Sequence, residues 1–492
     1  MRFTRRTLLG GAAALPVFGL PARAAAQGDD ARRAVLVVLP LVRKDYVGDS
    51  DTDTPNIEDL RGNSLRFDRV IPECMPALPL RRTLVTGVRS FPFRDWKRTE
   101  GMPAVPGYNP VWDWQPVMME TMGLGGVESV YVTDNPIIEG PRFGRVVRPG
   151  GRAETAGGET IQDEIAAIRR QTKAAERTYK AGIQQLRDFS GFVGIDPFDR
   201  VDAAQAPSIY IQPDEIEREG IGSMNDRLVE VDWSGDEVDD LRSAYRDHVE
   251  AVDEWFGRLM EEIPDDAFLF VLGDNGIALG EHDYIGRGTP TSHRESYEVP
   301  FMIRDPDGRK SGDDVDWYAS THDVAPTILS YMGLTIPGKM WGEDLTALLD
   351  DVDEDDLYDR PFSITASGSL IVVRDKRWLM VADREEIERR MYDDDEEVED
   401  DITRFQDIAN EDTGQLTDMS LAALAVAGGT LPEFGPDGAL RPPPERSDDD
   451  TDDDGIPNDF DAVDNDEPDD SDDREALEYD GRDAEDREAA RP

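Results

Sequence analysis

The oxygen-bearing residues best suited to chemistry follow a short apolar segment late in the chain. Asp274 and Asn275 come directly after residues 268–272, and a Gly-Glu-His sequence ending at His282 follows shortly afterwards. Residues 268–272 are continuously apolar, as in a strand that is buried on both faces. In sheets of parallel strands, ligands bind at the carboxyl ends of the strands. Since carboxylate and amide oxygens bind hard cations, Asp274 and Asn275 are candidate ligands of Ca²⁺ or Mg²⁺.

A second oxygen-rich pattern lies near the end of the sequence, at residues 450–461. It fits a calcium loop, with acidic side chains at the first, third, fifth and last positions and a backbone carbonyl at the seventh. These ligands would be Asp450, Asp452, Asp454, Asp461 and the carbonyl of Ile456. The sequence from Gly455 onward resembles a thrombospondin type 3 repeat. A segment this rich in Asp also produces such spacing by chance, so a solvated acidic tail is the alternative.

Strands and helices alternate along the chain in a way that favours an α/β fold with a parallel-rich sheet. Short apolar runs predict buried strands at residues 34–39, 129–133, 191–195, 267–272 and 301–303. Apolar residues at helical spacing predict helices at residues 160–189 and 237–262. Alternation within residues 364–381 predicts a hairpin of a small antiparallel subdomain.

Several segments resemble, in order and spacing, the sulfatase family of the alkaline phosphatase-like superfamily. They are residues 54–60, 81–87, 132–136, 274–304 and 322–329, and the resemblance covers about residues 33–410. It implies an alkaline phosphatase-like core with a mixed, largely parallel sheet between helices. The expected domains are a signal peptide at 1–26, the core at 27–360, a small C-terminal antiparallel subdomain at 361–440 and an acidic tail at 441–492.

The resemblance also implies a chemistry. In this family a calcium or magnesium ion polarises an ester while a nucleophile derived from Cys or Ser, or a Thr, attacks sulfur or phosphorus. Asp274 and Asn275 match two of the metal ligands. Arg81 matches the arginine of the nucleophile motif, and Arg287 stands where the family has a Lys.

Other members of that constellation are replaced. Ala77 falls on the nucleophile, and Pro40 and Leu41 fall where two acidic metal ligands should be. Val201 falls on a catalytic His. Neither Pro nor Leu can ligate a metal through its side chain, so the resemblance implies an incomplete catalytic centre and a doubtful core metal.

Three alternatives remain open at this stage. A shifted register makes Cys74 the formylglycine precursor, although it places Leu78 where the motif has Arg. A second alternative is a cation site rebuilt from four carboxylates, those of Asp45, Asp196, Asp199 and Asp274. His282 is at least as well explained as a structural residue of a turn.

The composition excludes some functions and indicates an unusual solvent. The 492 residues include 107 Asp and Glu against 53 Lys and Arg, a formal net charge of −54 at pH 7. This acidity excludes a generic nucleic-acid binder, because phosphate backbones are bound by basic surfaces. Only seven of the basic residues are Lys, a profile that resembles proteins of extreme halophiles. The single cysteine, Cys74, excludes an intrachain disulfide and a four-Cys zinc site.

The first 26 residues have the pattern of an export signal. A basic start is followed by an apolar stretch and by three consecutive Ala residues suited to cleavage. Residues 4–9 resemble the twin-arginine motif, so we expect a secreted or extracellular protein; an uncleaved N-terminal anchor is the alternative. No later run reaches the roughly 18 apolar residues of a transmembrane helix.

These observations favour an exported, catalytically degenerate sulfatase-like protein, a pseudoenzyme. Its expected ligands are sulfated or phosphorylated small molecules or glycans, bound through Arg81 and Arg287. The first alternative is an active metal-dependent hydrolase of sulfuric or phosphoric esters with an atypical nucleophile such as water or Cys74. The second is a surface protein that is assembled through calcium and the tail.

Overall fold

The computed structural model describes residues 32–350, apart from 74–76, 91–110, 112–113, 151–159, 188, 200–233, 282–284, 287–294 and 296, together with short stretches between 360 and 441. An eight-stranded sheet lies at the centre, in the order β10-β2-β9-β6-β1-β5-β3-β4. Its strands are β1 (Arg33–Leu39), β2 (Leu65–Val70), β3 (Ser129–Val132), β4 (Arg145–Val147), β5 (Phe192–Ile195), β6 (Ala267–Gly273), β9 (Phe301–Arg304) and β10 (Asp314–Ala319). Only β9 is antiparallel to its neighbours in this sheet, so the expected mixed, largely parallel sheet is confirmed.

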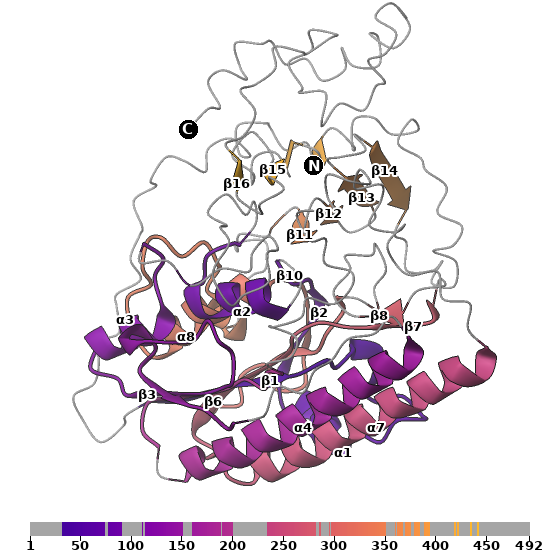
Figure 1. The fold of residues 1–492 in the computed structure, drawn as a ribbon. Coiled ribbons are helices and arrows are strands. Elements are labelled where there is room, and N and C mark those ends of the chain that lie inside the picture. The colour runs from indigo at the N-terminus through magenta and orange to yellow at the C-terminus, as the bar shows by residue number, and fades with distance from the viewer. Residues whose placement is uncertain are drawn as a thin grey trace, which may run out of the picture.

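Helices cover both faces of the sheet (Figure 1). On one face α4 (Ile161–Leu186) and α7 (Gly235–Met260) run side by side, with α1 (Pro55–Gly62) against α7. On the other face lie α2 (Ala77–Thr86), α3 (Met118–Leu124) and α8 (Val324–Tyr331). The chain therefore forms three layers, as expected for a parallel-rich sheet that must bury both of its faces.

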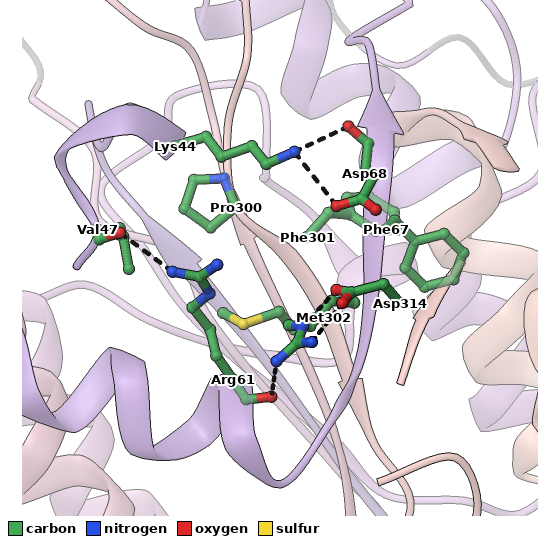
Figure 2. A pocket seen from close by; sticks show the side chains of 10 residues that line it. Lys44, Val47, Arg61, Phe67, Asp68, Pro300, Phe301, Met302 and Asp314 are labelled. Carbon is green, nitrogen blue, oxygen red and sulfur yellow. Dashed lines mark hydrogen bonds and ion pairs between the residues drawn. The ribbon is translucent and has the colours of Figure 1, made fainter. Parts of the chain in front are cut away.

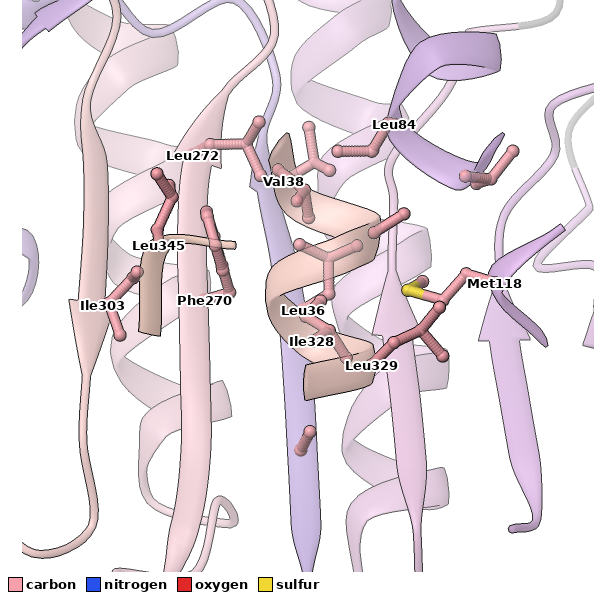
Figure 3. Packing of buried hydrophobic residues seen from close by; sticks show 14 of the residues in the cluster. Leu36, Val38, Leu84, Met118, Phe270, Leu272, Ile303, Ile328, Leu329 and Leu345 are labelled. Carbon is pink, nitrogen blue, oxygen red and sulfur yellow. The ribbon is translucent and has the colours of Figure 1, made fainter. Parts of the chain in front are cut away.

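The central strand β1 explains why both faces need a cover. Its side chains alternate, so Leu36 and Val38 join the core under α2 and α8 while Val35 and Val37 join the core under α4 and α7. Figure 3 shows the first of these cores, with Leu36 and Val38 among side chains from β6, β9, α2, α3 and α8. The continuously apolar sequence of β1 is the consequence of this two-sided burial.

The two long helices begin where the sequence predicts. Thr160 caps α4 by accepting a hydrogen bond from the backbone N–H of Asp163, whose side chain accepts from the N–H of Thr160 in return. Ser234 and Glu237 form the same reciprocal capping box at the start of α7. Capping boxes satisfy backbone donors that the first helical turn leaves without partners. Both predicted helices are confirmed.

The edge of the sheet was not predicted. Strands β2 and β10 carry charged residues at every second or third position, as in the sequences LRFDRV and DVDWYA. The pattern differs from the apolar runs of the central strands because each of these two strands keeps some side chains exposed or half-buried. Two very short strands, β7 (Ala278–Leu279) and β8 (Ile285–Gly286), form a ribbon directly after β6.

A second, smaller sheet lies beyond the core. It is an antiparallel meander of β11 (Ser363–Ser367), β12 (Leu370–Arg374), β13 (Trp378–Asp383) and β14 (Glu388–Asp393), which confirms the predicted small subdomain and adds two strands to the predicted hairpin. Two further short strands, β15 (Glu433–Phe434) and β16 (Leu440–Arg441), pair with each other. Within the described residues, no helix is both long and apolar enough to cross a bilayer.

The junction between the core and the small sheet is polar and buried. Arg360 donates to both carboxylate oxygens of Asp323 and, at 3.1 Å, to the carbonyl of Tyr318. Thr365 in β11 donates to the carbonyl of Pro72 at 2.7 Å. His322, in the short 3-10 helix η6 (Thr321–Asp323), is buried here, and neither ring nitrogen has a hydrogen-bond partner among the described residues.

The position of His322 makes the stability of the fold depend on pH. Burial, and then the positive charges of Arg89 and Arg360, hold the pKa of His322 well below its ordinary value of about 6.5. In the unfolded chain the ring regains its ordinary pKa, so unfolding takes up a proton as the pH falls below that value. The stability from neutral His322 is therefore complete above about pH 6.5 and is lost as the pH falls towards the folded-state pKa.

We expect the free energy of unfolding of the wild type to fall by up to about 1.4 kcal/mol per pH unit below pH 6.5 through this one group. In His322→Gln that contribution is absent, so the difference between the two proteins should shrink as the pH drops from 7 to 5. Urea unfolding at constant salt measures it. An unchanged difference across this range would contradict the assignment.

Candidate functional site

The candidate site forms where three neighbouring parallel strands end. Strands β6, β1 and β5 are adjacent in the sheet, and their carboxyl ends lead into Asp274, Leu41 and Asp196 respectively. Helix α2 brings Arg81 to the same place. The edge at the carboxyl ends of parallel strands is where ligands bind in folds of this kind.

Arg81 lies between the two carboxylates. Its Nε is 2.7 Å from Oδ1 of Asp196, and its Nη2 is 2.8 Å from Oδ2 of Asp274. Nη2 also donates to the carbonyl of Pro197 at 2.9 Å, and the guanidinium carbon lies 5.0 Å from the centre of the Phe198 ring. The side chain of Arg81 is only 1% exposed. We call Arg81, Asp196 and Asp274 the arginine–carboxylate triad.

Both carboxylates receive further hydrogen bonds. Oδ1 of Asp274 accepts from the backbone N–H groups of Leu41, at 2.6 Å, and Asn275, at 2.8 Å. Oδ2 of Asp196 accepts from the hydroxyl of Thr133 at 3.4 Å. The triad is therefore embedded in a network of donors, as buried ion pairs must be to offset their loss of water.

The electrostatics favour a charged arginine. Burial opposes the charge of Arg81, but the carboxylates of Asp196 and Asp274 outweigh it and raise the pKa of Arg81 above its ordinary value. Burial raises the pKa of Asp196 against the opposing effect of Arg81. The guanidinium is thus a permanent, buried cation shared by two carboxylates.

The loop after β1 is held firmly in an unusual shape. Leu41 has φ of 54°, a left-handed conformation that is rare for a residue with a bulky side chain. The Tyr245 hydroxyl donates to the carbonyl of Leu41 at 2.9 Å, and Nε2 of His248 lies 2.9 Å from the carbonyl of Pro40. The Tyr179 hydroxyl donates to the carbonyl of Val38 at 2.8 Å. Helices α4 and α7 therefore fix the backbone that points the N–H of Leu41 at Asp274.

These residues do not fit the divalent cation that the sequence resemblance implies. Both oxygens of Asp274 already accept hydrogen bonds from Leu41, Asn275 and Arg81. Leu41 presents a backbone donor, not an acceptor, and the amide of Asn275 donates to the carbonyl of Gly276 at 2.8 Å. A cation needs several oxygen lone pairs directed at one point. Here the lone pairs of the Asp274 oxygens accept hydrogen bonds from the guanidinium of Arg81 and from two backbone N–H groups.

The prediction that the carboxylates of Asp45, Asp196, Asp199 and Asp274 form one cation site is wrong. Asp45 forms an ion pair with Arg43, and Asp199 lies 3.3 Å from Nε of Arg170. Asp196 and Asp274 share Arg81. Within the part of the chain that the structure describes, no three His, Cys, Asp or Glu side chains come together as a metal site.

Several predicted residues lie outside the described part of the chain. They are Cys74, Val201, His282, Arg287 and the calcium-loop residues Asp450, Asp452, Asp454, Ile456 and Asp461. Ala77 is the first residue of α2, and Asn275 is buried beside Asp274. The expectation that Arg81 contacts a ligand is corrected, because its guanidinium is buried between two carboxylates.

The partnership of Asp196 with Arg81 was not predicted. Asp196 follows an apolar run at residues 191–195 in the way that Asp274 follows β6, and that shared position after a buried strand is the signal that could have linked them. Nothing in the spacing of Arg81 names its partners, which are 115 and 193 positions away.

A small surface hollow also gathers basic residues (Figure 2). It is lined by Lys44, Arg61 and Arg66 together with Asp68 and Asp314, among others. Lys44 donates to the carbonyl of Asp68 at 3.0 Å, Arg61 to that of Val47 at 3.1 Å, and Arg66 is paired with Asp314. With a cavity volume of about 30 Å³, the hollow has room for little more than water. It is a satisfied surface network and offers no ligand site.

The triad should dominate the stability of this region. Arg81→Leu leaves two carboxylates buried without their cation, and we expect the free energy of unfolding to fall by about 3–5 kcal/mol. Arg81→Lys should lose less because it keeps the charge but cannot bridge both partners in the same way. Urea unfolding measures both. The matched control is Arg258→Leu, which breaks an exposed pair with Glu254 and should cost about 1 kcal/mol or less; equal losses at the two positions would contradict the role of the triad.

Comparison with known proteins agrees with this architecture. Residues 27–334 match the family described as Sulfatase, and residues 280–415 match that described as N-sulphoglucosamine sulphohydrolase, C-terminal. The 2,3-bisphosphoglycerate-independent phosphoglycerate mutase of Natronomonas pharaonis is 39% identical over 101 residues, which are 20% of this chain and 19% of that protein. The chain thus spans about a fifth of the length of this curated relative.

Two solved structures have a similar fold. Phosphonate monoester hydrolase SpPMH from Silicibacter pomeroyi gives a TM-score of 0.59 at 17% identity, over 85% of this chain and 100% of that chain. BT4656, in complex with its substrate D-glucosamine-2-N,6-O-disulfate, gives 0.56 at 15% identity, over 80% of this chain and 97% of that chain. At such identities the likeness concerns the fold alone. Because the Sulfatase match covers more than half of the sequence, this chain belongs to the sulfatase family, within the alkaline phosphatase-like superfamily.

Proposed function

We propose that this chain is a sulfatase-family protein that no longer hydrolyses esters and instead binds sulfated or phosphorylated glycans at or outside the cell surface. The observation that carries the loss of hydrolysis is the arginine–carboxylate triad. Asp274 is the retained metal-ligand position, and both of its carboxylate oxygens accept hydrogen bonds, from Arg81 and from two backbone N–H groups. The neighbouring positions that should supply acidic ligands are Pro40 and Leu41.

The anionic ligand class is supported from two directions. BT4656, which shares the fold, has a disulfated glucosamine as its substrate. The export-like N-terminal sequence would bring this chain to the extracellular space, where sulfated glycans occur. Neither argument depends on Arg81, and the binding surface must lie outside the triad because the guanidinium of Arg81 is buried.

Hydrolysis is tested by comparison with a variant that changes only the centre. We expect wild type and Asp274→Asn to show the same background rate with aryl sulfate, aryl phosphate and phosphonate monoester substrates, in molar salt with Ca²⁺, Mg²⁺ or Mn²⁺. We also expect elemental mass spectrometry to find equal amounts of divalent metal in the two full-length proteins. Turnover, or about one ion per chain, that disappears in Asp274→Asn would establish instead a metal-dependent hydrolase with an atypical nucleophile.

The acidic tail is proposed as a separate calcium site. Residues 450–461 supply the oxygen spacing of a calcium loop, so replacing both Asp450 and Asp454 by Asn should remove about one bound calcium per chain. Calcium titration of both proteins, monitored by calorimetry, measures this. Equal stoichiometry in the two proteins would identify the tail as a solvated polyanion.

A further inference from the structure

Three large apolar side chains are exposed in the described part of the chain, and all three lie around α3 and the segment after α8. Trp114 is 46% exposed just before α3, and Leu124 is 87% exposed as the last residue of α3. Trp341, which follows α8, is 51% exposed. Exposed apolar side chains that gather on one surface mark an interaction site more often than scattered ones do.

A hydrogen bond connects the two segments that carry the tryptophans. Lys339 extends its Nζ to the carbonyl of Trp114, at 3.4 Å, and lies two positions before Trp341. The backbone N–H of Trp341 donates to the carbonyl of Gly87, at 2.8 Å, at the end of α2. Met340 is buried beside Gly87, while Trp341 next to it points to solvent. The backbone is therefore anchored and the indoles are left on the surface.

The chemistry of this surface suits a sugar that carries negative charge. An indole offers a flat apolar face with a polar N–H, and the C–H face of a pyranose ring packs against such a face while its hydroxyls stay in water. Lys339 supplies a cation beside the tryptophans, and in the described part of the chain it forms no ion pair. A few polar groups among aromatic side chains are the usual composition of a small-molecule site.

We propose that Trp114, Trp341 and Lys339 form a surface subsite for a sulfated sugar, with the sugar ring on an indole and the sulfate near Lys339. The assignment rests on the proposed function and places its ligand outside the buried triad. A cation beside two exposed indoles fits a sugar that carries sulfate, and a second copy of this chain is the alternative occupant that the test distinguishes. Binding at this subsite would require neither a metal ion nor a nucleophile.

Binding of a heparin octasaccharide, compared with its fully desulfated, N-acetylated form, tests the proposal on the full-length protein. Calorimetry and tryptophan fluorescence would be recorded at several salt concentrations. We expect Trp114→Ala and Trp341→Ala each to weaken binding of the sulfated probe at least tenfold. Lys339→Met should remove most of the preference for the sulfated over the desulfated form.

A matched control separates this subsite from general effects. Lys173→Met removes an exposed lysine on α4, which lies on the opposite face of the sheet from α3 and α8, and should bind as the wild type does. Circular dichroism and urea midpoints should be unchanged in all variants, because the altered side chains are at the surface.

Three results would overturn the proposal. Binding that is equal in the wild type and both tryptophan variants would place the ligand elsewhere and leave the proposed function intact. Absence of binding in the wild type would remove both the subsite and the anionic-glycan part of the proposed function, whereas the turnover comparison with Asp274→Asn still decides hydrolysis separately. Sedimentation showing self-association that the tryptophan variants abolish would identify the surface as a contact between copies.

Discussion

The buried guanidinium of Arg81 is the feature on which the centre of this molecule depends. It joins the end of β5, through Asp196, to the end of β6, through Asp274, and it does so from α2. Removing charges from water costs several kcal/mol per ion, and only close, well-aligned partners offset that cost. The short distances, the added backbone donors and the fixed position of α2 meet this requirement. The one cation is thus shared by two carboxylates, and hydrogen bonds from backbone N–H groups stabilise the remaining negative charge.

The surroundings of the triad show how the fold accommodates it. Leu41 keeps a strained left-handed backbone because Tyr245 and His248 of α7 hold the carbonyls of the same loop. Strain of this kind persists where neighbouring structure determines it strongly, and it is frequent at functional centres. Here its result is a backbone N–H directed at Asp274. A loop position that the family resemblance assigns to a metal ligand thus supplies a hydrogen-bond donor.

The fold and the chemistry of the site can change independently, because the fold depends on the apolar core side chains and the chemistry on the polar side chains at the end of the sheet. The two apolar cores on either side of β1 contain none of the triad residues, so the three-layer architecture is maintained whatever occupies the end of the sheet. The backbone of Trp341 is held by the carbonyl of Gly87, directly after α2, and the carbonyl of Trp114 accepts from Lys339.

Much of this protein follows from its sequence by itself. Continuous apolar runs located β1 and β6, because strands buried on both faces exclude charge, and apolar residues at helical spacing located α4 and α7. The position of Asp274 after a buried strand located the site. The edge strand β10 and its neighbour β2 escaped prediction, since their interspersed charges resemble those of a surface loop as much as those of a strand. Only the tertiary structure decided that Arg81 lies between Asp196 and Asp274, because an ion pair depends on distance in space, and residues more than a hundred positions apart carry no sign of their partnership.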